Sequence, residues 1–236
     1  MKKRFLILFL LFVSPLVMAN KITATSWLVA DGEGHIIESR NSTEQRSIAS
    51  LTKLMTAMIV LDAGQDMTEE ISGLTRYDLL QLMLIKSDNQ AAELLCEHFP
   101  TGRSGCITAM NMKAMYLGLH ETHYVDPSGL NIMNVSTAEE LVKIVITASK
   151  YPDIVHSSNI YQAKVKKKKR TLVFHNTNPL VAAQDFIVSK TGYIRASGGC
   201  IVMMLNTKIG QRIVVLLNSR NTHTRIPEAK QLAMNF

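Results

Sequence analysis

A serine and a lysine three residues apart, Ser50 and Lys53, form the pair in this chain that best fits nucleophilic catalysis. Residues three positions apart on a helix lie on one face, one turn from each other. A serine hydroxyl is a poor nucleophile until a neighbouring base takes its proton. Lys53 lies in the otherwise apolar segment 50–63, where a lysine is costly without a purpose. The spacing therefore predicts that Ser50 is a nucleophile at the start of a buried helix, with Lys53 as its base.

The position of Ser50 and the charge state of Lys53 both bear on this chemistry. At the first turn of a helix, the dipole and the free N–H groups favour a developing oxyanion. Lys53 can act as a base only if its pKa falls well below the ordinary value of about 10.4. Partial burial and a second cation both lower the pKa of a lysine, and Lys190 is the candidate for the second cation.

A second polar motif, Ser87-Asp88-Asn89, falls between two helical stretches. Taken alone, it is best explained as the N-cap of a helix over residues 89–98, because short polar side chains favour that position. In the presence of the other motifs, Ser87 and Asn89 of this motif are predicted to take part in catalysis. Ser87 is then predicted to relay a proton to the leaving group, and Asn89 to hydrogen-bond the substrate amide and Lys53.

A third motif, Lys190-Thr191-Gly192, ends an apolar strand. Lys190 and Thr191 can bind an anionic or polar end of a substrate, and Gly192 lets a substrate backbone come close because it has no side chain. The backbone N–H groups of Ser50 and Tyr193 are expected to form an oxyanion hole, an effect worth about 3 kcal/mol per donor. The three motifs together predict an enzyme that forms and breaks an acyl-serine bond.

Strand patterns at both ends of the chain enclose a helical middle. The expected helices cover residues 50–63, 76–85, 89–98, 104–119, 137–150 and 227–234. The expected strands cover residues 22–30, 35–39, 161–165, 171–174, 186–190, 199–205 and 212–218. This order predicts an α/β fold of the α+β type, in which one antiparallel sheet is built from both termini and a helical region of about 64–154 is inserted.

The first 19 residues have the layout of a secretory signal peptide. Three basic residues precede the apolar run 5–17, and small-enough residues precede a cut before Asn20. That run of 13 residues is short for a membrane span, which needs roughly 20. An uncleaved membrane anchor is the alternative. We expect residues 1–19 to be removed and the protein to work outside the cytoplasm, in the periplasm.

The net charge of the chain argues against one class of function, nucleic-acid binding. Without residues 1–19 the chain holds 23 basic and 19 acidic residues, a net charge of +4. This mild excess, with no interleaving of basic and aromatic residues, does not indicate nucleic-acid binding. It would favour contact with anionic polymers. The basic run 166–170 is best explained as a solvated hairpin tip; the alternative is attraction to an anionic membrane or wall polymer.

Three cysteines are an odd number for an oxidising compartment. Cys96 and Cys106 lie ten residues apart across a turn and are predicted to form a disulfide, which leaves Cys200 as a buried thiol in an apolar strand. No cysteine pair has the spacing of metal ligands. His120 and His123 are close in sequence but lie in a turn-like segment without further ligands, so no metal site is predicted.

With these motifs in the order found, the chain resembles the low-molecular-weight penicillin-binding proteins, which are secreted D-alanyl-D-alanine peptidases of the bacterial wall. Within them it is most similar to the D-alanyl-D-alanine endopeptidases. The resemblance spans Thr25 to Glu228. Its closest segments are residues 48–57, 126–130, 134–138, 176–180, 190–193 and 200–203.

The resemblance implies a serine enzyme that cuts peptide cross-links of peptidoglycan through an acyl-Ser50 intermediate, without metal or cofactor. β-Lactams such as penicillin would acylate the same serine. It also implies a fold like that of the serine β-lactamases and DD-peptidases, an antiparallel sheet flanked by helices with an inserted all-helical subdomain. Residues 20–236 would form a single DD-peptidase domain.

Three departures from the family pattern bear on the substrate. The segment Asp62–Thr75 is shorter than usual, and Ala196 and Gly199 stand where bulkier or charged residues are common. The sequence stops at Phe236 without the C-terminal β-domain of the carboxypeptidases. We expect the last feature to favour endopeptidase activity, while the first two leave the substrate open.

Three other activities remain as alternatives. One is a D-Ala-D-Ala carboxypeptidase of the same family. Another is a class A-like β-lactamase, which needs a glutamate placed for deacylation; Glu139 and Glu140 open a helix and suit that role poorly. The third is a non-catalytic wall-binding protein, which would usually have lost its nucleophile or base, whereas Ser50 and Lys53 are both present.

Overall fold

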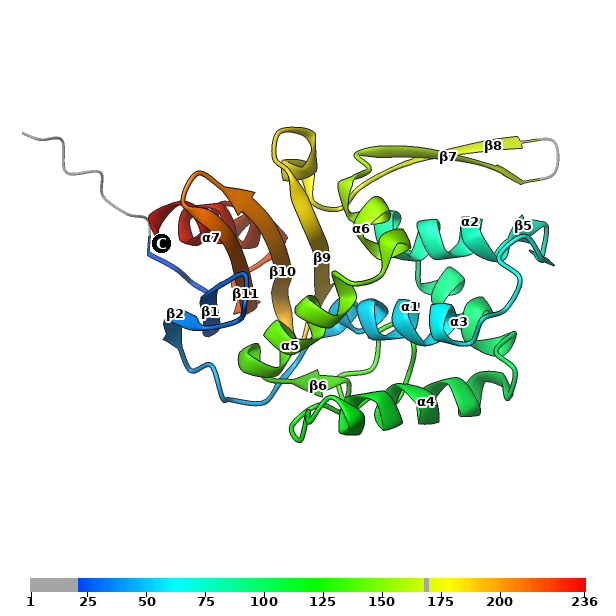
Figure 1. The fold of residues 1–236 in the computed structure, drawn as a ribbon, viewed down its shortest axis with the longest axis horizontal. Coiled ribbons are helices and arrows are strands. Elements are labelled where there is room, and N and C mark those ends of the chain that lie inside the picture. Colours follow the sequence, from blue (N-terminus) through cyan, green and yellow to red (C-terminus); the bar gives the residue numbers. More distant parts are fainter. Residues whose placement is uncertain (1–20, 168–169) are drawn as a thin grey trace, which may run out of the picture.

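A five-stranded antiparallel sheet with the order β2-β1-β11-β10-β9 forms the centre of the fold (Figure 1). The computed structural model describes residues 21–167 and 170–236, so the predicted signal peptide lies outside the described residues. The strands are β1 (Ser26–Asp31), β2 (Ile36–Arg40), β9 (Phe186–Ile194), β10 (Gly198–Thr207) and β11 (Gly210–Ser219). Because β1 pairs with β11, the sheet is built from both ends of the chain, as predicted.

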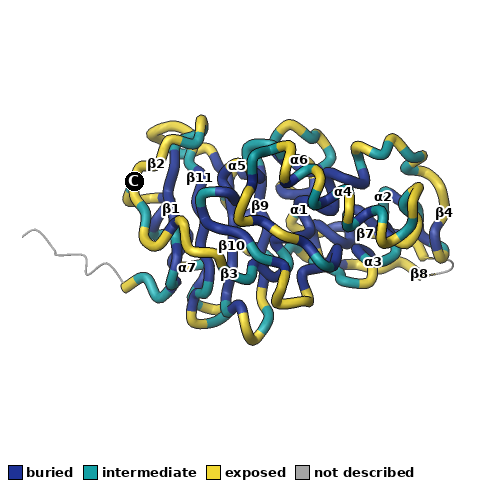
Figure 2. Tube along the Cα trace, turned by 90° about the horizontal axis from the view of Figure 1, so that it is seen from below, coloured by how far each residue is buried: buried dark blue, intermediate teal, exposed yellow. Residues whose placement is uncertain are grey.

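Both faces of this sheet are buried, and its central strands form the core of the molecule (Figure 2). Successive side chains of a strand point to opposite faces. On β11, Ile213 and Val215 belong to the larger apolar cluster beneath α1 (Thr52–Asp62) and α5 (Ala138–Ala148). Val214 belongs to the smaller cluster beneath α7 (Thr222–Asn235). The sequences of the central strands are therefore continuous apolar runs, because helices cover the sheet on both sides.

The remaining helices lie beside the sheet, on the right of Figure 1. They are α2 (Arg76–Gln81), the π-helical turn η2 (Leu82–Lys86), α3 (Asn89–Glu97), α4 (Gly102–Tyr116) and α6 (Pro152–Asn159). Short 3₁₀ turns are η1 (Ala49–Leu51) and η3 (Pro179–Ala182), and the short strand pairs are β3 (Arg46–Ser47) with β6 (Val135–Ser136) and β4 (Glu70–Ile71) with β5 (Leu74–Thr75). A disulfide joins Cys96 of α3 to Cys106 of α4.

The type or the bounds of several helices differ from those expected from the sequence. The chain forms α6 directly after Tyr151, where strands were expected, because Pro152 occupies the first helical position and its fixed backbone suits a helix start. The helix expected over 76–85 continues beyond α2 as the π-helical turn η2. The closing helix starts earlier than expected, at Thr222, and contains Pro227 within it.

A β-hairpin stands apart from the main sheet. Its strands β7 (Gln162–Lys167) and β8 (Arg170–His175) pair only with each other among the described strands, and they extend above α2 in Figure 1. Of the basic run 166–170, Lys166 and Lys167 end β7 and Arg170 begins β8, and residues 168 and 169 are not described. Within the described residues, no helix combines the length and the apolar character that crossing a bilayer requires.

Candidate active site

The three motifs meet at one corner of the molecule, where the start of α1, the start of α3 and strand β9 come together. Lys53 is the centre of this corner. Its Nζ donates to Ser50 Oγ at 2.9 Å and to Asn89 Oδ1 at 2.7 Å, and also to the carbonyl of Ser128. A helical spacing of three residues thus brings Ser50 and Lys53 together, and the amide of Asn89 is added only by the packing of α3 against α1.

Burial controls the charge of Lys53. The side chain is fully buried, which lowers the Lys53 pKa to about 8, while Asp126, Asp88 and Glu93 oppose this shift through their negative charges. A neutral amine can accept a proton, whereas an ammonium cannot. At neutral pH a usable fraction of Lys53 is therefore in the base form, hydrogen-bonded to the hydroxyl that it would deprotonate.

The turn that carries the nucleophile is tightly enclosed by backbone. Ala49, directly before Ser50, has a φ of +46°, a left-handed conformation that costs energy in a residue with a side chain. A Cβ added to Gly129 would lie 1.9 Å from the Ala49 carbonyl oxygen, and one added to Gly192 would lie 3.0 Å from Ser50 N. Gly192 was expected to make room for a substrate; in the structure its lack of a side chain makes room for the nucleophile turn.

The loop around Asp126 holds Gly129 in place. The Asp126 carboxylate accepts hydrogen bonds from the backbone N–H groups of Ser128 at 2.7 Å, Gly129 at 2.6 Å and Asn131 at 2.7 Å. Burial raises the Asp126 pKa, but these donors outweigh burial and hold it below its ordinary value. Reasoning from single residues missed this loop, and its signal was the 126–130 segment of the family resemblance.

Asn134 connects that loop to the nucleophile turn. Its Oδ1 accepts from the backbone N–H of Val125 at 2.8 Å, and its Nδ2 donates to Thr52 Oγ1 at 3.1 Å. Its carbonyl also accepts from the backbone N–H of Ile48 at 3.0 Å. Asn134 is fully buried, and its side-chain hydrogen bonds join two segments that are far apart in sequence.

Ser87 faces the second buried lysine. Ser87 has a φ of +62° at the end of η2, and its hydroxyl accepts a hydrogen bond from Lys190 Nζ at 2.8 Å. Lys190 Nζ also donates to the Thr191 carbonyl at 2.9 Å. Burial, together with the charges of Lys53 and Arg225, holds the Lys190 pKa well below its ordinary value. Lys53 and Lys190 are therefore neighbours, as expected, and Ser87 is hydrogen-bonded to Lys190.

Two contacts hold strand β9 at this corner. Thr191 Oγ1 donates to Thr177 Oγ1 at 2.6 Å, which ties the third motif to the chain segment after β8. Arg225 of α7 donates from Nη1 to the Gly192 carbonyl at 2.5 Å. The Arg225 Nε is buried without a hydrogen-bond partner among the described residues. Sequence reasoning missed Arg225, because nothing in its helical surroundings connects it to a strand more than thirty residues away.

Tyr193 follows Gly192 on β9 and is 46% exposed at the edge of the corner. Gly192 packs against Ser50 N, so the backbone at Tyr193 lies beside the nucleophile turn. The oxyanion hole built from the N–H groups of Ser50 and Tyr193 stays a prediction.

Other reactive groups lie elsewhere. Cys200 is fully buried on β10, where it pairs in register with Gly192, and burial raises the pKa of its thiol. Within the described residues, the grouping of side chains with metal-ligand geometry is Asp31, Glu33 and His35, in the exposed turn between β1 and β2. None of these side chains touches Ser50.

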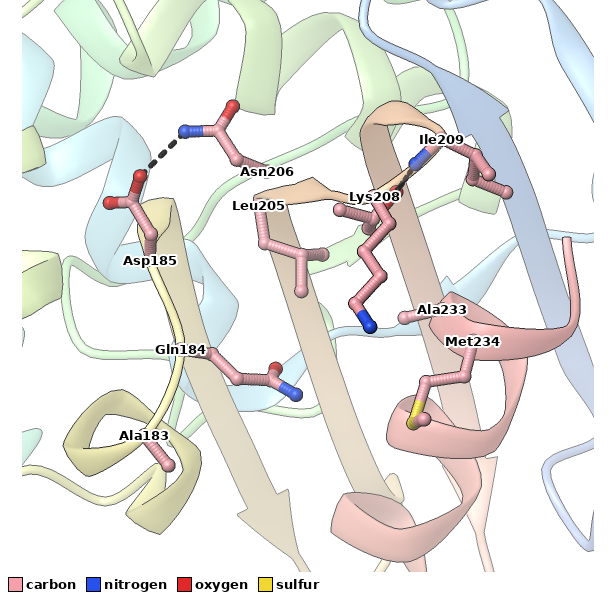
Figure 3. A pocket seen from close by; sticks show the side chains of 10 residues that line it. Ala183, Gln184, Asp185, Leu205, Asn206, Lys208, Ile209, Ala233 and Met234 are labelled. Carbon is pink, nitrogen blue, oxygen red and sulfur yellow. Dashed lines mark hydrogen bonds between the residues drawn. The ribbon is translucent and has the colours of Figure 1, made fainter.

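A hollow of about 680 Å³ lies away from the three motifs, between the turn that joins β10 to β11, the end of α7 and the segment before β9 (Figure 3). Leu205, Lys208 and Met234 are among the side chains that line it. Leu205 pairs with Phe186 at the start of β9, whereas Lys190 lies four residues further along that strand. The chemistry of this molecule is therefore at the corner around Lys53 and not in this hollow.

Comparisons with known proteins agree with this geometry. The family profile described as D-alanyl-D-alanine carboxypeptidase matches residues 14–73 and 65–221. The chain is 34% identical to the D-alanyl-D-alanine endopeptidase of Escherichia coli strain K12, over 90% of this chain and 76% of that protein. It is 32% identical to the D-alanyl-D-alanine endopeptidase of Pseudomonas aeruginosa, over 92% of this chain and 78% of that protein.

A solved structure shares the whole architecture. Penicillin-binding protein D2 from Listeria monocytogenes, in its ampicillin-bound form, matches with a TM-score of 0.80 at 25% identity. The match covers 89% of this chain and 96% of that one. The expected fold, an antiparallel sheet with helices of the DD-peptidase type, is thereby confirmed.

Proposed function

Because this chain belongs to the D-alanyl-D-alanine carboxypeptidase family, peptidase family S11, it is a penicillin-binding serine D-Ala-D-Ala peptidase, and we propose that it cleaves D-alanine-containing cross-links of peptidoglycan as an endopeptidase. The proposal includes a covalent acyl-Ser50 intermediate. The observation that carries this mechanism is the position of Lys53 Nζ, 2.9 Å from Ser50 Oγ and buried.

The first step is attack by the serine. Neutral Lys53 takes the proton of Ser50 Oγ as the oxygen bonds to the substrate carbonyl carbon, and the carbonyl oxygen becomes an oxyanion. The N–H groups of Ser50 and Tyr193 stabilise that oxyanion. Asn89 orients Lys53 by accepting from its Nζ at 2.7 Å. Its NH₂ group, which has no partner among the described residues, can then donate to the substrate amide.

The second step expels the amine of the far peptide. The Ser87 hydroxyl lies 2.8 Å from Lys190 Nζ. The hydroxyl passes a proton to the leaving nitrogen and is reprotonated by the proton that Lys53 took from Ser50, so the acyl group stays on Ser50 and Lys53 is neutral again. Neutral Lys53 then takes a proton from the attacking water and delivers it to Ser50 Oγ as the ester bond breaks, which releases the shortened peptide and restores the free enzyme. No metal or cofactor is required in this sequence of steps.

Lys190, Thr191 and Arg225 supply the polar surroundings for the substrate end. Lys190 and Thr191 lie on the strand next to Ser50, and Arg225 adds a buried cation behind Gly192. A positive charge close to the site favours a substrate that carries negative charge. These groups support recognition of a peptide that carries carboxylates.

Two findings favour the endopeptidase over the other activities. Relatives at 34% and 32% identity, matched over about nine-tenths of this chain, are named endopeptidases, although the family as a whole is described as carboxypeptidases. A class A-like lactamase is disfavoured because both candidate glutamates are occupied elsewhere. Glu139 accepts from Ser42 Oγ at 2.7 Å, and Glu140 accepts from Thr122 Oγ1 at 2.6 Å.

We propose the periplasm as the place of this activity. The support comes from the signal-peptide pattern of residues 1–19 and from the disulfide between Cys96 and Cys106, a bond that persists in oxidising compartments. Peptidoglycan cross-links are found outside the cytoplasm, so the location and the substrate agree.

Purified enzyme tests the proposal directly. It should convert dimeric muropeptides linked through D-alanine into monomers faster than it releases terminal D-alanine from pentapeptides, as followed by liquid chromatography. Labelled penicillin should add one acyl group to the peptide that contains Ser50, and Ser50→Ala should carry none. Release of D-alanine with dimers untouched would make the enzyme a carboxypeptidase, and an adduct on Ser87 would refute the assigned nucleophile.

A further inference from the structure

The basic excess of this protein is concentrated on one hairpin. Residues 154–184 contain six basic residues and no Asp or Glu. Three of the 26 basic residues lie in 1–19, which leaves 17 for the rest of the chain against all 19 acidic residues. Apart from this segment and residues 1–19, the chain is slightly acidic. The positive charge is therefore a local feature of segment 154–184 and not a property of the whole chain, and four of its six basic residues lie on β7 and β8.

The described basic side chains of the hairpin are fully available. Lys164, Lys166, Lys167 and Arg170 are all exposed, and none of them forms an ion pair with another described residue. By contrast, Lys113 elsewhere on the surface pairs with Asp62 at 2.7 Å. Exposed cations without counterions attract anions over about 8 to 10 Å at moderate salt, so the hairpin presents an uncompensated positive field.

The pairing of β7 with β8 sorts these side chains by face. Ala163 and Phe174, directly opposite each other, are buried, and Val165 is buried on the same face. This apolar face packs towards η2 and β5. The alternate residues Lys164 and Lys166 therefore point away from the body of the protein. Residues two apart on a strand are about 7 Å apart, so the outward face carries a row of separate charges.

The hairpin leads directly to the active site. Two residues after β8 ends, Thr177 accepts the hydrogen bond from Thr191, and its backbone N–H donates to the Ile85 carbonyl at 3.1 Å. Ile85 lies two residues before Ser87 in the second motif. A long substrate held between Ser87 and Thr191 and leaving the corner on this side would run along the basic face.

We propose that the outward face of the β7–β8 hairpin binds the free carboxylates of peptidoglycan stem peptides next to the one being cut, and so holds the enzyme on the polymer. The proposal rests on the family's substrate and not on the choice between endopeptidase and carboxypeptidase. Peptidoglycan fits because it repeats its carboxylates along a chain, as the hairpin repeats its cations. A membrane fits less well, because Val173, opposite Lys164, is an isolated apolar side chain among the charges of that face. The exposed Leu172 lies on the other face, opposite Val165.

Binding to isolated sacculi tests the proposal. The enzyme is first acylated with penicillin, so that the active site itself cannot hold substrate. The test variant is Lys164→Gln/Lys166→Gln/Lys167→Gln/Arg170→Gln. The matched control is Lys150→Gln/Lys208→Gln/Arg220→Gln/Lys230→Gln, which removes four exposed cations outside the hairpin. We expect the test variant to bind at least about tenfold more weakly at low salt and the control to change less than about twofold.

A chemical change on the polymer identifies the partner. Sacculi whose carboxyl groups have been amidated should lose wild-type binding to the level of the test variant. An equal loss of sacculus binding in the test and control variants would show that only net charge matters and would overturn the proposal. Undiminished binding of the test variant to sacculi, or of the wild type to amidated sacculi, would also overturn it. Binding to phosphatidylglycerol vesicles in place of sacculi would also overturn it and identify a membrane surface instead.

Catalytic assays separate this proposal from the proposed function. The test variant should keep the parental rates of penicillin acylation and of soluble dimer cleavage, since no hairpin cation touches Ser50 or Lys53. Its rate on intact sacculi should fall in parallel with binding. If the enzyme binds sacculi through the hairpin but leaves dimers untouched, the endopeptidase proposal is refuted and the docking proposal stands. Slower acylation in the test variant would show that the hairpin supports the active site and would refute a pure docking role.

Discussion

Two regions of this protein use lysines in opposite ways. At the active-site corner, Lys53 and Lys190 are almost wholly buried, and each is hydrogen-bonded to a serine hydroxyl. On the β7–β8 hairpin, Lys164 and Lys166 are exposed and form no ion pair within the part of the chain that the structure describes. Burial penalises the charged form of a lysine and makes it a base, whereas water keeps an exposed lysine as a plain positive charge. The same residue type thus supports proton transfer in one region and long-range attraction in the other.

The largest expected difference between the two regions comes from single lysine removals. Lys53→Ala should slow penicillin acylation by about 10³- to 10⁴-fold, because the base that activates Ser50 is lost. Lys164→Ala should leave the acylation rate unchanged. Stopped-flow measurement with a fluorescent penicillin gives both rates, with circular dichroism as the check on folding. If Lys53→Ala acylates at the parental rate, Lys53 is not the base and the contrast between the regions fails.

Backbone packing at the corner is a second point of difference. Gly129→Ala should slow acylation by about 10²-fold, because the new Cβ meets the Ala49 carbonyl and displaces the nucleophile turn by the order of an ångström. Gly118→Ala is the matched control, since its φ of +66° carries similar backbone strain but its added Cβ meets nothing within 4 Å. Equal effects of the two variants on acylation would show that strain, and not the contact with Ala49, is responsible.

The second buried lysine is expected to matter less than the first. Lys190→Gln should reduce acylation at low penicillin concentration by about tenfold to a hundredfold, the range for losing a charged hydrogen bond at a binding site. Lys166→Gln should have no effect in this assay. Rates measured over a range of penicillin concentrations separate capture from chemistry. A loss as large as that of Lys53→Ala would make Lys190 a partner in the base and not a binding group.

The smallest predicted effect is the rise of the acylation rate between pH 7 and 8, about fivefold for a base with a pKa of about 8. Since only neutral Lys53 accepts a proton and its pKa is lowered to about 8, the acylation rate should rise about tenfold per pH unit well below 8 and level off above it. The rise reports deprotonation, so its sign is positive with pH. The rise should be absent from the residual rate of Lys53→Ala. A wild-type profile that is flat from pH 6 to 9 would contradict a lysine base with this pKa.

Sequence by itself determined the chemical core of this protein. The three-residue spacing of Ser50 and Lys53 is a helical spacing, so local geometry alone brings the hydroxyl and the amine to one face. The apolar strand patterns at both ends of the chain likewise predicted the shared sheet, because hydrophobic periodicity depends on neighbours in sequence. The turn between Cys96 and Cys106 was short enough for the disulfide to be expected from spacing.

Tertiary structure decided what holds that core in place. Gly129 packs on Ala49 and Arg225 reaches the Gly192 carbonyl across long separations in sequence. The pKa of Lys53 depends on burial by segments that no local pattern connects. The separation of β7 and β8 from the main sheet was also invisible in their alternating pattern, which is the same for any half-buried strand. Local periodicity fixes which elements form, but only packing decides which distant residues meet.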